Sequence, residues 1–337
     1  MKNNEIPIMT CFDKNYVIQA AVAFYSLLEN SDKNYFYNIY VLTSDINEKL
    51  QKQLCDSVKE FDNCKINFVN MNNQFEELWN KIYIGDHFSK EVMYKLLISS
   101  IFPQYEKIIV TDVDVVFLSD ISKSYVDFDV NGDYYMAGVK QISKIEPYMI
   151  TYEEDWDKEE IKKLSNICGG YIVFNIKKIR EDNFEEVLVK YFEDNAYRLN
   201  QMEQDVLNIC CYGKVKYLKL NYVACSYLWD YFPNTKSLKE DKVYSAEEIK
   251  DAMDNPIQLH YATHIKPWKN VDCQKSEIWF QYLAKTNFLE TYLKQLPEKI
   301  IVDKTNLAVK EFLKEMNNFL CVTPLGIEKE GLETFKQ

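Results

Sequence analysis

The first 70 residues alternate between strand patterns and helix patterns, and this alternation constrains the fold more than any other feature. Residues 6–12, 36–43 and 65–69 are apolar runs of strand length, whereas 17–28 and 46–61 carry apolar residues at helical spacing. Parallel strands need such helical crossovers, and these are right-handed in nearly all cases. The chain is therefore expected to form a doubly wound α/β sheet, in which ligands bind beyond the carboxyl ends of the strands.

A later apolar strand, 107–118, is interrupted by two acidic residues. β-branched residues precede Asp112 and follow Asp114, and burying two uncompensated carboxylates in such a run is costly. Carboxylates two residues apart can share one divalent ion if the chain turns between them, and Mg²⁺ and Mn²⁺ prefer oxygen ligands. We therefore expect a metal site at this edge of the sheet. Asp127 and Asp129 have the same spacing but lead into a turn-like Asn-Gly pair, so we expect them to be solvated.

Composition bounds the class of protein. The 337 residues are 47% apolar and 27% charged, as in an ordinary globular chain of one large α/β domain or two small ones. The net charge of −12 and the lack of a basic cluster argue against a nucleic-acid partner. Nine cysteines without a C-x-x-C pair suggest a reducing compartment. The first residues have no apolar core, and no run of about 18 apolar residues occurs, so we expect neither a signal peptide nor a membrane span.

The remaining elements follow from the same patterns. Residues 140–166 are polar with poor periodicity, which predicts a mobile loop able to close over a ligand. The chain reads as helical from 273 onward, and 304–320 could pack on the domain, pair with a second subunit or approach a membrane surface. Other expected helices span 91–102, 182–197 and 202–211, and other expected strands span 134–139, 168–175, 215–222 and 257–261.

A late histidine and lysine provide further candidates. His260 lies on an apolar strand six residues before Lys266. An imidazole beside two carboxylates makes a mixed O,O,N site, which Mn²⁺ tolerates better than Mg²⁺ or Ca²⁺. Lys266 precedes a rigid Pro-Trp pair and could place an ammonium on a phosphate, although an ordinary surface lysine is the alternative. Because no glycine-rich phosphate loop is present, phosphates would be held by metal and side chains.

A polar cluster follows the first strand. Tyr16 could stack on a nucleobase while Asp13 and Asn15 read the edge of that base. The alternative is a helix cap followed by a tyrosine that packs on the helix.

These motifs occur in an order that resembles glycosyltransferase family 8, a group of retaining UDP-sugar transferases that includes glycogenin and bacterial lipopolysaccharide galactosyl- and glucosyltransferases. The resemblance covers roughly residues 5–295. The motifs, in chain order, are Asp13-Lys-Asn-Tyr16, Met-Tyr94-Lys-Leu-Leu, Asp112-Val-Asp114, Gly169-Gly-Tyr-Ile-Val-Phe-Asn, Gln204-Asp205, and His260 followed after five residues by Lys266-Pro-Trp.

The resemblance implies a GT-A fold, with a catalytic domain at 1–272 and a helical extension at 273–337. It implies that Mn²⁺, or alternatively Mg²⁺, is bound by Asp112, Asp114 and His260. It also implies three further groups of site residues. These are Asp13, Asn15 and Tyr16 for the uridine; His87, Asp112, Val113 and Lys266 for the rest of the donor; and Gln204 near the anomeric carbon, with Lys95, Glu203 and Asp205 beside it.

The chain departs from the family pattern at several positions on the donor-sugar and acceptor side. Lys95 replaces the usual arginine, and a lysine cannot reproduce a bidentate fork. Glu203 stands for the commoner Asp, Cys168 for an Asn, Gln141 for an Asp and Thr263 for a Gly. These differences leave the donor sugar open.

Three functions are therefore in competition. The first is a retaining, Mn²⁺-dependent hexosyltransferase that moves galactose or glucose from a UDP-hexose to a hydroxyl of a glycan, a lipid-linked saccharide or a glycoprotein. It would act in the cytoplasm or at the inner face of the membrane. The second is a non-catalytic UDP-sugar-binding protein. The third is a sugar nucleotidyltransferase. Such an enzyme normally has a glycine-rich, basic loop after the first strand, and residues 10–14 do not form such a loop.

Overall fold

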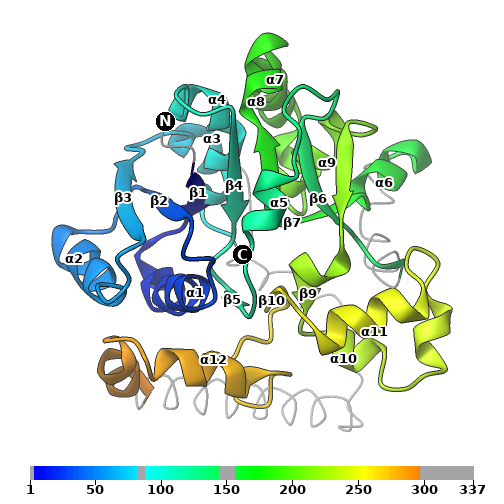
Figure 1. Ribbon diagram of the computed structural model, residues 1–337. Helices are drawn as coiled ribbons and strands as arrows, with labels where there is room; N and C mark the ends of the chain where they lie inside the picture. The colour runs from blue at the N-terminus through cyan, green and yellow to red at the C-terminus, as the bar shows by residue number, and fades with distance from the viewer. Residues whose placement is uncertain (1–3, 82–87, 144–155, 297–337) are drawn as a thin grey trace, which may run out of the picture. The chain divides into compact units, whose positions relative to one another are not determined.

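A seven-stranded sheet forms the centre of the chain in the computed structural model, which describes residues 4–81, 88–143 and 156–296 (Figure 1). The strand order is β3-β2-β1-β4-β7-β6-β8, and β7 runs antiparallel to both of its neighbours within an otherwise parallel sheet. The predicted α/β sheet is thus confirmed. The strands are β1 (Glu5–Cys11), β2 (Phe36–Thr43), β3 (Cys64–Asn70), β4 (Lys107–Thr111), β6 (Met136–Lys140), β7 (Ile167–Asn175) and β8 (Val215–Leu218).

The helical crossovers predicted in the first 70 residues are present. α1 (Val17–Glu29) joins β1 to β2, and α2 (Glu48–Asp56) joins β2 to β3. The α2 helix is shorter than the predicted 46–61: it begins after Asn47, whose side chain accepts a hydrogen bond from the Leu50 N–H, and it already ends at Asp56. α1 is buried along almost its whole length, since it packs against both β5 and α12.

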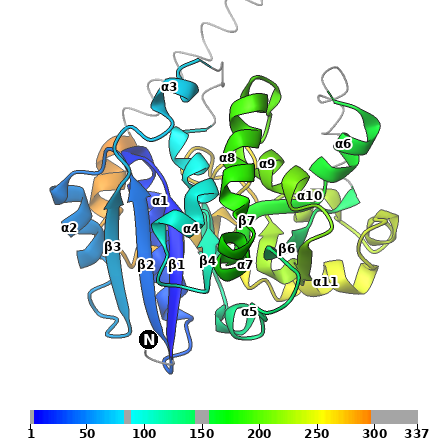
Figure 2. The same ribbon diagram turned by 90° about the horizontal axis from the view of Figure 1, so that it is seen from above.

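A second group of helices packs around the β4 and β7 half of the sheet. α4 (Ile98–Ile101), α7 (Ile176–Glu181), α8 (Phe184–Asn195) and α9 (Glu203–Cys210) lie next to one another there (Figure 2). They bury an apolar cluster that includes Leu96, Ile108, Phe174, Phe192 and Leu207. Within this group, α9 also packs on β7, the strand that pairs with β4.

The strand predicted at 107–118 is divided between two sheets. β4 ends at Thr111 in the large sheet, and the chain enters a second, three-stranded sheet of order β5-β10-β9 at Val115. The strands of this sheet are β5 (Val115–Phe117), β9 (Ala224–Cys225) and β10 (Gln258–His260). Asp112 and Asp114 therefore occupy the turn between two sheets, which is why an apolar run can carry two carboxylates.

Two predicted segments differ from the structure. Residues 91–102 form the 3₁₀ helix η2 (Lys90–Leu97) followed by α4, because buried positions follow one another from 93 to 96 and do not fit one apolar face of an α-helix. Within the predicted loop 140–166, the capping box of Asp157 and Glu160 starts α6 (Lys158–Leu164). Residues 144–155, the centre of the proposed lid, lie outside the described residues.

Other elements were not anticipated. α7 and α11 (Ala246–Asp254) were missed, although Ser245 and Glu248 form a capping box at the start of α11. The predicted strand 215–222 ends at Leu218 and continues as the 3₁₀ helix η5 (Leu220–Val223). The remaining short elements are η1 (Lys14–Tyr16), α3 (Glu76–Trp79), α5 (Ser122–Val126), η4 (Ala196–Arg198), α10 (Leu228–Tyr231) and η6 (Ser237–Glu240).

The chain divides into one compact unit, Met1–Phe288, and a second that starts at Leu289. In the first unit, α12 (Ser276–Leu283) packs on α1. In the second, residues 289–296 are helical, while 297–337, including the predicted helical segment 304–320, lie outside the described residues. The boundary at residues 272 and 273 stays a prediction. Within the described ranges, no helix combines the length and the apolar character that a membrane span requires.

Candidate functional site

A cleft of about 990 Å³ lies where the two sheets meet. Its walls include the turn after β4, the start of β7, the first turn of α9 and the segment that follows β10. This is the carboxyl edge of β4, where the fold was expected to bind its ligand. Most of the predicted site residues line this cleft.

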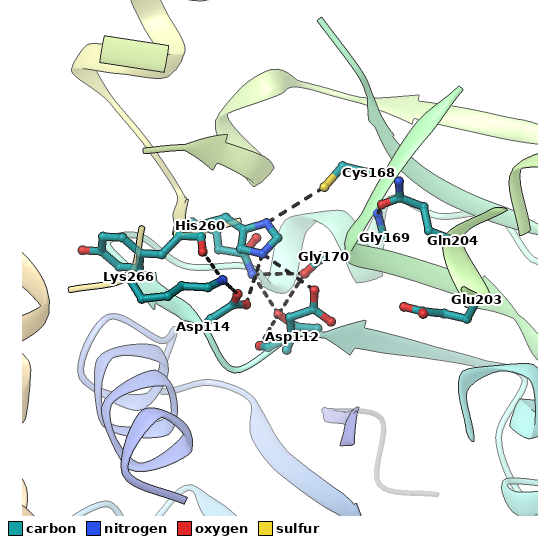
Figure 3. A network of polar contacts seen from close by, with 12 residues as sticks. Asp112, Asp114, Cys168, Gly169, Gly170, Glu203, Gln204, His260 and Lys266 are labelled. Carbon is teal, nitrogen blue, oxygen red and sulfur yellow. Dashed lines mark hydrogen bonds and ion pairs between the residues drawn. The ribbon is translucent and has the colours of Figure 1, made fainter. Parts of the chain in front are cut away.

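Three predicted metal ligands converge in the cleft. Asp112, Asp114 and His260 each offer a ligand atom, and these atoms lie within 4.8 Å of one another (Figure 3). The Nε2 atom of His260 is 3.1 Å from Asp114 Oδ1 and 3.7 Å from Asp112 Oδ2. Two carboxylates and one imidazole form the O,O,N donor set that suits Mn²⁺. The residues present therefore fit a divalent cation.

The glycine at position 170 makes room for the imidazole. A Cβ atom on Gly170 would lie 2.5 Å from His260 Nδ1, closer than real Cβ atoms approach other atoms. The main chain of Gly170 also accepts a hydrogen bond from the Asp112 N–H at 3.3 Å. The glycine pair at the start of β7 thus allows His260 to reach the two carboxylates.

Lysines balance the charge of both carboxylates. Lys266 Nζ lies 2.6 Å from Asp114 Oδ2, and Lys95 Nζ lies 2.7 Å from Asp112 Oδ1. Burial alone would raise the pKa of Asp114, but the Lys266 ammonium and the His260 imidazole outweigh it and hold that pKa well below its usual range. Burial opposes a charged His260, yet the Asp114 carboxylate raises the pKa of the imidazole to about 10. Lys266 is therefore part of the site and is not an ordinary surface lysine.

Lys95 also forms an ion pair with Glu203. Its Nζ atom lies 2.7 Å from Glu203 Oε1, and the lysine side chain is only 1% exposed. Burial raises the pKa of Glu203 although Lys95 opposes this shift, whereas the two carboxylates raise the pKa of Lys95 well above its usual value despite its burial. At a contact of 2.7 Å we take the pair as ionised. The lysine–glutamate pair thus lies at the two positions where the family resemblance led us to expect arginine and aspartate.

Gln204 and Asp205 lie at the start of α9. The Gln204 Oε1 atom accepts a hydrogen bond from the Gly169 N–H at 2.7 Å, which ties the side chain to β7. Asp205 is fully buried and accepts hydrogen bonds from the N–H groups of Asn200 and Gln201. Its carboxylate therefore holds the loop before α9, which orients Gln204.

The expected uridine residues lie after β1. The Asp13 carboxylate caps η1 and accepts hydrogen bonds from both the N–H and the side-chain amide of Asn15. Of the three residues, Tyr16 lines the cleft, and its ring packs edge-on against Trp268 at 6.0 Å. The cap described as the alternative interpretation is therefore present, together with a tyrosine that faces the cleft.

The other predicted residues are divided between the cleft and the surface. Val113 lines the cleft. His87 lies outside the described residues. Asp127 forms an exposed ion pair with Lys123, and Asp129 caps a turn at Asn131, so the pair is solvated as expected.

Sequence reasoning missed a pair of thiols beside His260. Cys168 Sγ lies 3.9 Å from His260 Nδ1, and Cys225 belongs to the same cluster. The hydrogen bond between the thiols is the main cause that lowers the pKa of Cys168 and raises that of Cys225. No sequence signal marks the pair, because 56 residues separate the two cysteines.

Comparisons with known proteins agree with this geometry. The model of the family "Glycosyl transferase family 8" matches residues 7–272. General stress protein A of Bacillus subtilis (strain 168) is 23% identical over 301 residues, which cover 86% of this chain and 96% of that protein.

Two solved structures show the fold. The apo structure of the bifunctional glycosyltransferase WbbM has a TM-score of 0.70 at 22% identity, over 87% of this chain and 52% of its own. The galactosyltransferase LgtC, in complex with donor and acceptor sugar analogs, has a TM-score of 0.62 at 18% identity, over 84% of this chain and 96% of its own. The chain thus spans about half of WbbM and nearly all of LgtC. The architecture is the GT-A fold of these transferases.

Proposed function

The chain belongs to glycosyltransferase family 8, and on this premise we propose that it moves a hexose, galactose or glucose, from a UDP-hexose to a hydroxyl group. The acceptor would be a glycan, a lipid-linked saccharide or a glycoprotein. The observation that carries the proposal is the convergence of Asp112, Asp114 and His260 in one large cleft. Such an O,O,N set is suited to hold the cation that accompanies a nucleoside diphosphate.

Asp112, Asp114 and His260 would hold Mn²⁺, with Mg²⁺ as the alternative. A bound divalent ion supplies Lewis-acid stabilisation of the diphosphate leaving group. Lys266 already faces the same place, since its ammonium is 2.6 Å from Asp114. With a divalent ion held by Asp112, Asp114 and His260, the Lys266 ammonium would be available to pair with a phosphate oxygen as negative charge develops there.

The base of the donor would occupy the Tyr16 side of the cleft. The tyrosine ring offers a stacking surface, and the cap formed by Asp13 and Asn15 keeps η1 in place beside it. Of the residues expected to hold the rest of the donor, Asp112, Val113 and Lys266 line the cleft. The role of His87 stays a prediction.

Gln204 would stabilise the anomeric centre. Its Oε1 atom is held by Gly169, so the side chain has a fixed position beside the metal ligands. A carboxamide is a weak nucleophile, and we therefore favour front-face attack through a short-lived oxocarbenium ion pair over a covalent intermediate. Asp205 and the pair of Lys95 with Glu203 would act by holding Gln204 and Asp112 in place. Chemical trapping of a sugar on Gln204 would overturn this choice.

A donor screen tests the proposal. The protein is incubated with Mn²⁺ and UDP-glucose, UDP-galactose or their N-acetyl forms, and UDP release is measured with and without glycan acceptors. One hexose donor should be turned over in a Mn²⁺-dependent reaction. The anomeric configuration of the product, read by nuclear magnetic resonance, should match that of the donor, whereas an inverted product would contradict a retaining mechanism.

The main alternative is a non-catalytic UDP-sugar-binding protein. It is motivated by Lys95, whose ammonium contacts both Asp112 and Glu203 at 2.7 Å, so that its engagement with a donor sugar would require rearrangement. This alternative predicts that UDP binds while neither hydrolysis nor transfer occurs. A nucleotidyltransferase would instead release pyrophosphate from UTP. The cytoplasmic location, the approach to a membrane and homo-oligomerisation stay predictions.

A further inference from the structure

A second cluster of metal-ligating side chains lies directly behind the carboxylate site. Within the described residues, two groups of three can offer ligand atoms to one ion, and the second consists of Cys168, Cys225 and His260. Its ligand atoms also lie within 4.8 Å of one another. All three residues line the cleft, so an ion from solvent can reach them.

Two different sheets build this cluster. Cys225 on β9 and His260 on β10 are register partners in a parallel pair, so their side chains project from the same face of the small sheet. Cys168 comes from the start of β7 in the large sheet. The room that Gly170 leaves for the imidazole also brings its Nδ1 atom to 3.9 Å from Cys168 Sγ (Figure 3).

The spacing suits a tetrahedral thiophilic ion. Zinc bonds of about 2.3 Å to sulfur and about 2.0 Å to nitrogen separate the two ligand atoms by about 3.5 Å. The observed 3.9 Å between Cys168 Sγ and His260 Nδ1 is within a few tenths of that value. Cys168 Sγ and His260 Nδ1 would therefore need to approach each other by only a few tenths of an ångström.

The Nε2 atom of His260 already contacts a carboxylate, as the second ring nitrogen of a zinc-binding histidine usually does. Histidines that bind zinc through one nitrogen generally donate the N–H of the other to a carboxylate, which fixes the tautomer. His260 Nε2 lies 3.1 Å from Asp114 Oδ1. A metal on Nδ1 would therefore find its histidine oriented by Asp114.

We propose that Cys168, Cys225 and His260 form a second metal site, selective for Zn²⁺, that shares its imidazole with the carboxylate site. Binding requires Cys168 and Cys225 as thiolates and a His260 without a proton on Nδ1, so any proton on these three atoms would be released to solvent. A fourth, solvent ligand would face the cleft. Thiolates select Zn²⁺ over Mn²⁺, so the two sites differ in the ion that they take.

A neutral imidazole has one lone pair, so His260 can serve one of the two sites at a time. Zn²⁺ at the thiols would remove the nitrogen ligand from Asp112 and Asp114. This consequence rests on the proposed function: Zn²⁺ would inhibit the transferase by weakening the hold of the carboxylate site on Mn²⁺. The site itself can be tested without any activity.

Cobalt absorption tests the site directly. The full-length, reduced protein is titrated with Co²⁺, and the near-ultraviolet sulfur-to-cobalt charge-transfer band is recorded. The wild type should show this band at one equivalent, and Zn²⁺ should abolish it. Asp112→Asn and Cys273→Ser should retain the band, because the first alters only the carboxylate site and the second removes a different cysteine of the cleft.

Cys168→Ser and Cys225→Ser should each lose the band. Thermal melting identifies folded variants, and if Cys225→Ser fails to fold, Cys168→Ser decides the question alone. A wild type without a thiolate band, or a band that persists in folded Cys168→Ser, would overturn the proposal.

A second measurement concerns inhibition and requires an active enzyme. The Zn²⁺ concentration that halves the rate should rise more than about tenfold in Cys168→Ser, since even partners outside the ligand shell change metal affinity by that factor. Unchanged Zn²⁺ sensitivity beside a confirmed cobalt band would reject the inhibitory role alone. An inactive wild type with a normal band would instead contradict the proposed transferase function.

Discussion

Replacing Lys95 by methionine should destabilise the chain strongly. The Lys95 ammonium lies 2.7 Å from both Asp112 Oδ1 and Glu203 Oε1, and the lysine side chain is 1% exposed. With an effective dielectric constant of about 20, each contact provides about 6 kcal/mol of attraction before desolvation is subtracted. Methionine keeps the apolar stem but leaves Glu203 buried without its cation, and breaking a buried pair in this way costs about 3–5 kcal/mol.

Urea unfolding followed by circular dichroism, with a chelator present, measures this loss. Lys95→Met should lower the unfolding free energy by about 3–5 kcal/mol. Adding Glu203→Leu should recover much of it, because both charges then leave together. Lys52→Met is the matched control, since it breaks an exposed pair with Asp56 and should leave the midpoint unchanged. A Lys95→Met protein as stable as the wild type, or strictly additive losses in the double variant, would refute the reasoning.

Three further predictions concern the cleft. Gly170→Ala should weaken Mn²⁺ binding about 10- to 100-fold, measured by electron paramagnetic resonance, because the added Cβ displaces His260. Gly132→Ala is the control and should leave Mn²⁺ binding unchanged, because a Cβ there would lie 3.5 Å from its nearest atom, the Asp129 carbonyl oxygen. Tyr16→Ala should weaken UDP binding in calorimetry by about 1–3 kcal/mol if the ring stacks on the base, while Tyr16→Phe keeps the affinity. The His260 pKa is raised from 6.5 to about 10, so its charge stabilises metal-free protein fully below pH 6.5 and progressively less up to about pH 10. Between pH 6.5 and about pH 10 the melting temperature of the wild type should therefore fall more than that of His260→Gln. Equal slopes of melting temperature against pH in the two proteins would contradict a raised pKa of His260.

The two carboxylates of the site were predictable because charged residues rarely occur inside an apolar strand. Carboxylates within an apolar run need compensation, and this singled out Asp112 and Asp114 without any knowledge of the fold. The periodicity also predicted β1, α1 and β2 closely. The turn between two sheets was not predictable, since β4 and β5 look like one strand until their partners are known.

Contacts between distant segments could not be predicted from spacing. Lys95 meets Glu203 across 108 positions, and neither residue has a local signature. Cys168 and Cys225 meet because β7 and β9 belong to sheets that join at the cleft. The start of α6 is a different case. Asp157 and Glu160 have the spacing of a capping box, which predicts a helix start, although the surrounding segment is polar and aperiodic.

The most direct test of the account compares UDP-hexose turnover in the wild type, Asp112→Ala and Asp114→Ala while Mn²⁺ is titrated. Thermal melting of each protein verifies that it is folded. The account predicts a wild type whose turnover depends on Mn²⁺ and two folded variants without turnover at any Mn²⁺ concentration. Full activity in either variant would contradict the assignment of these two carboxylates as the metal site of a glycosyltransferase.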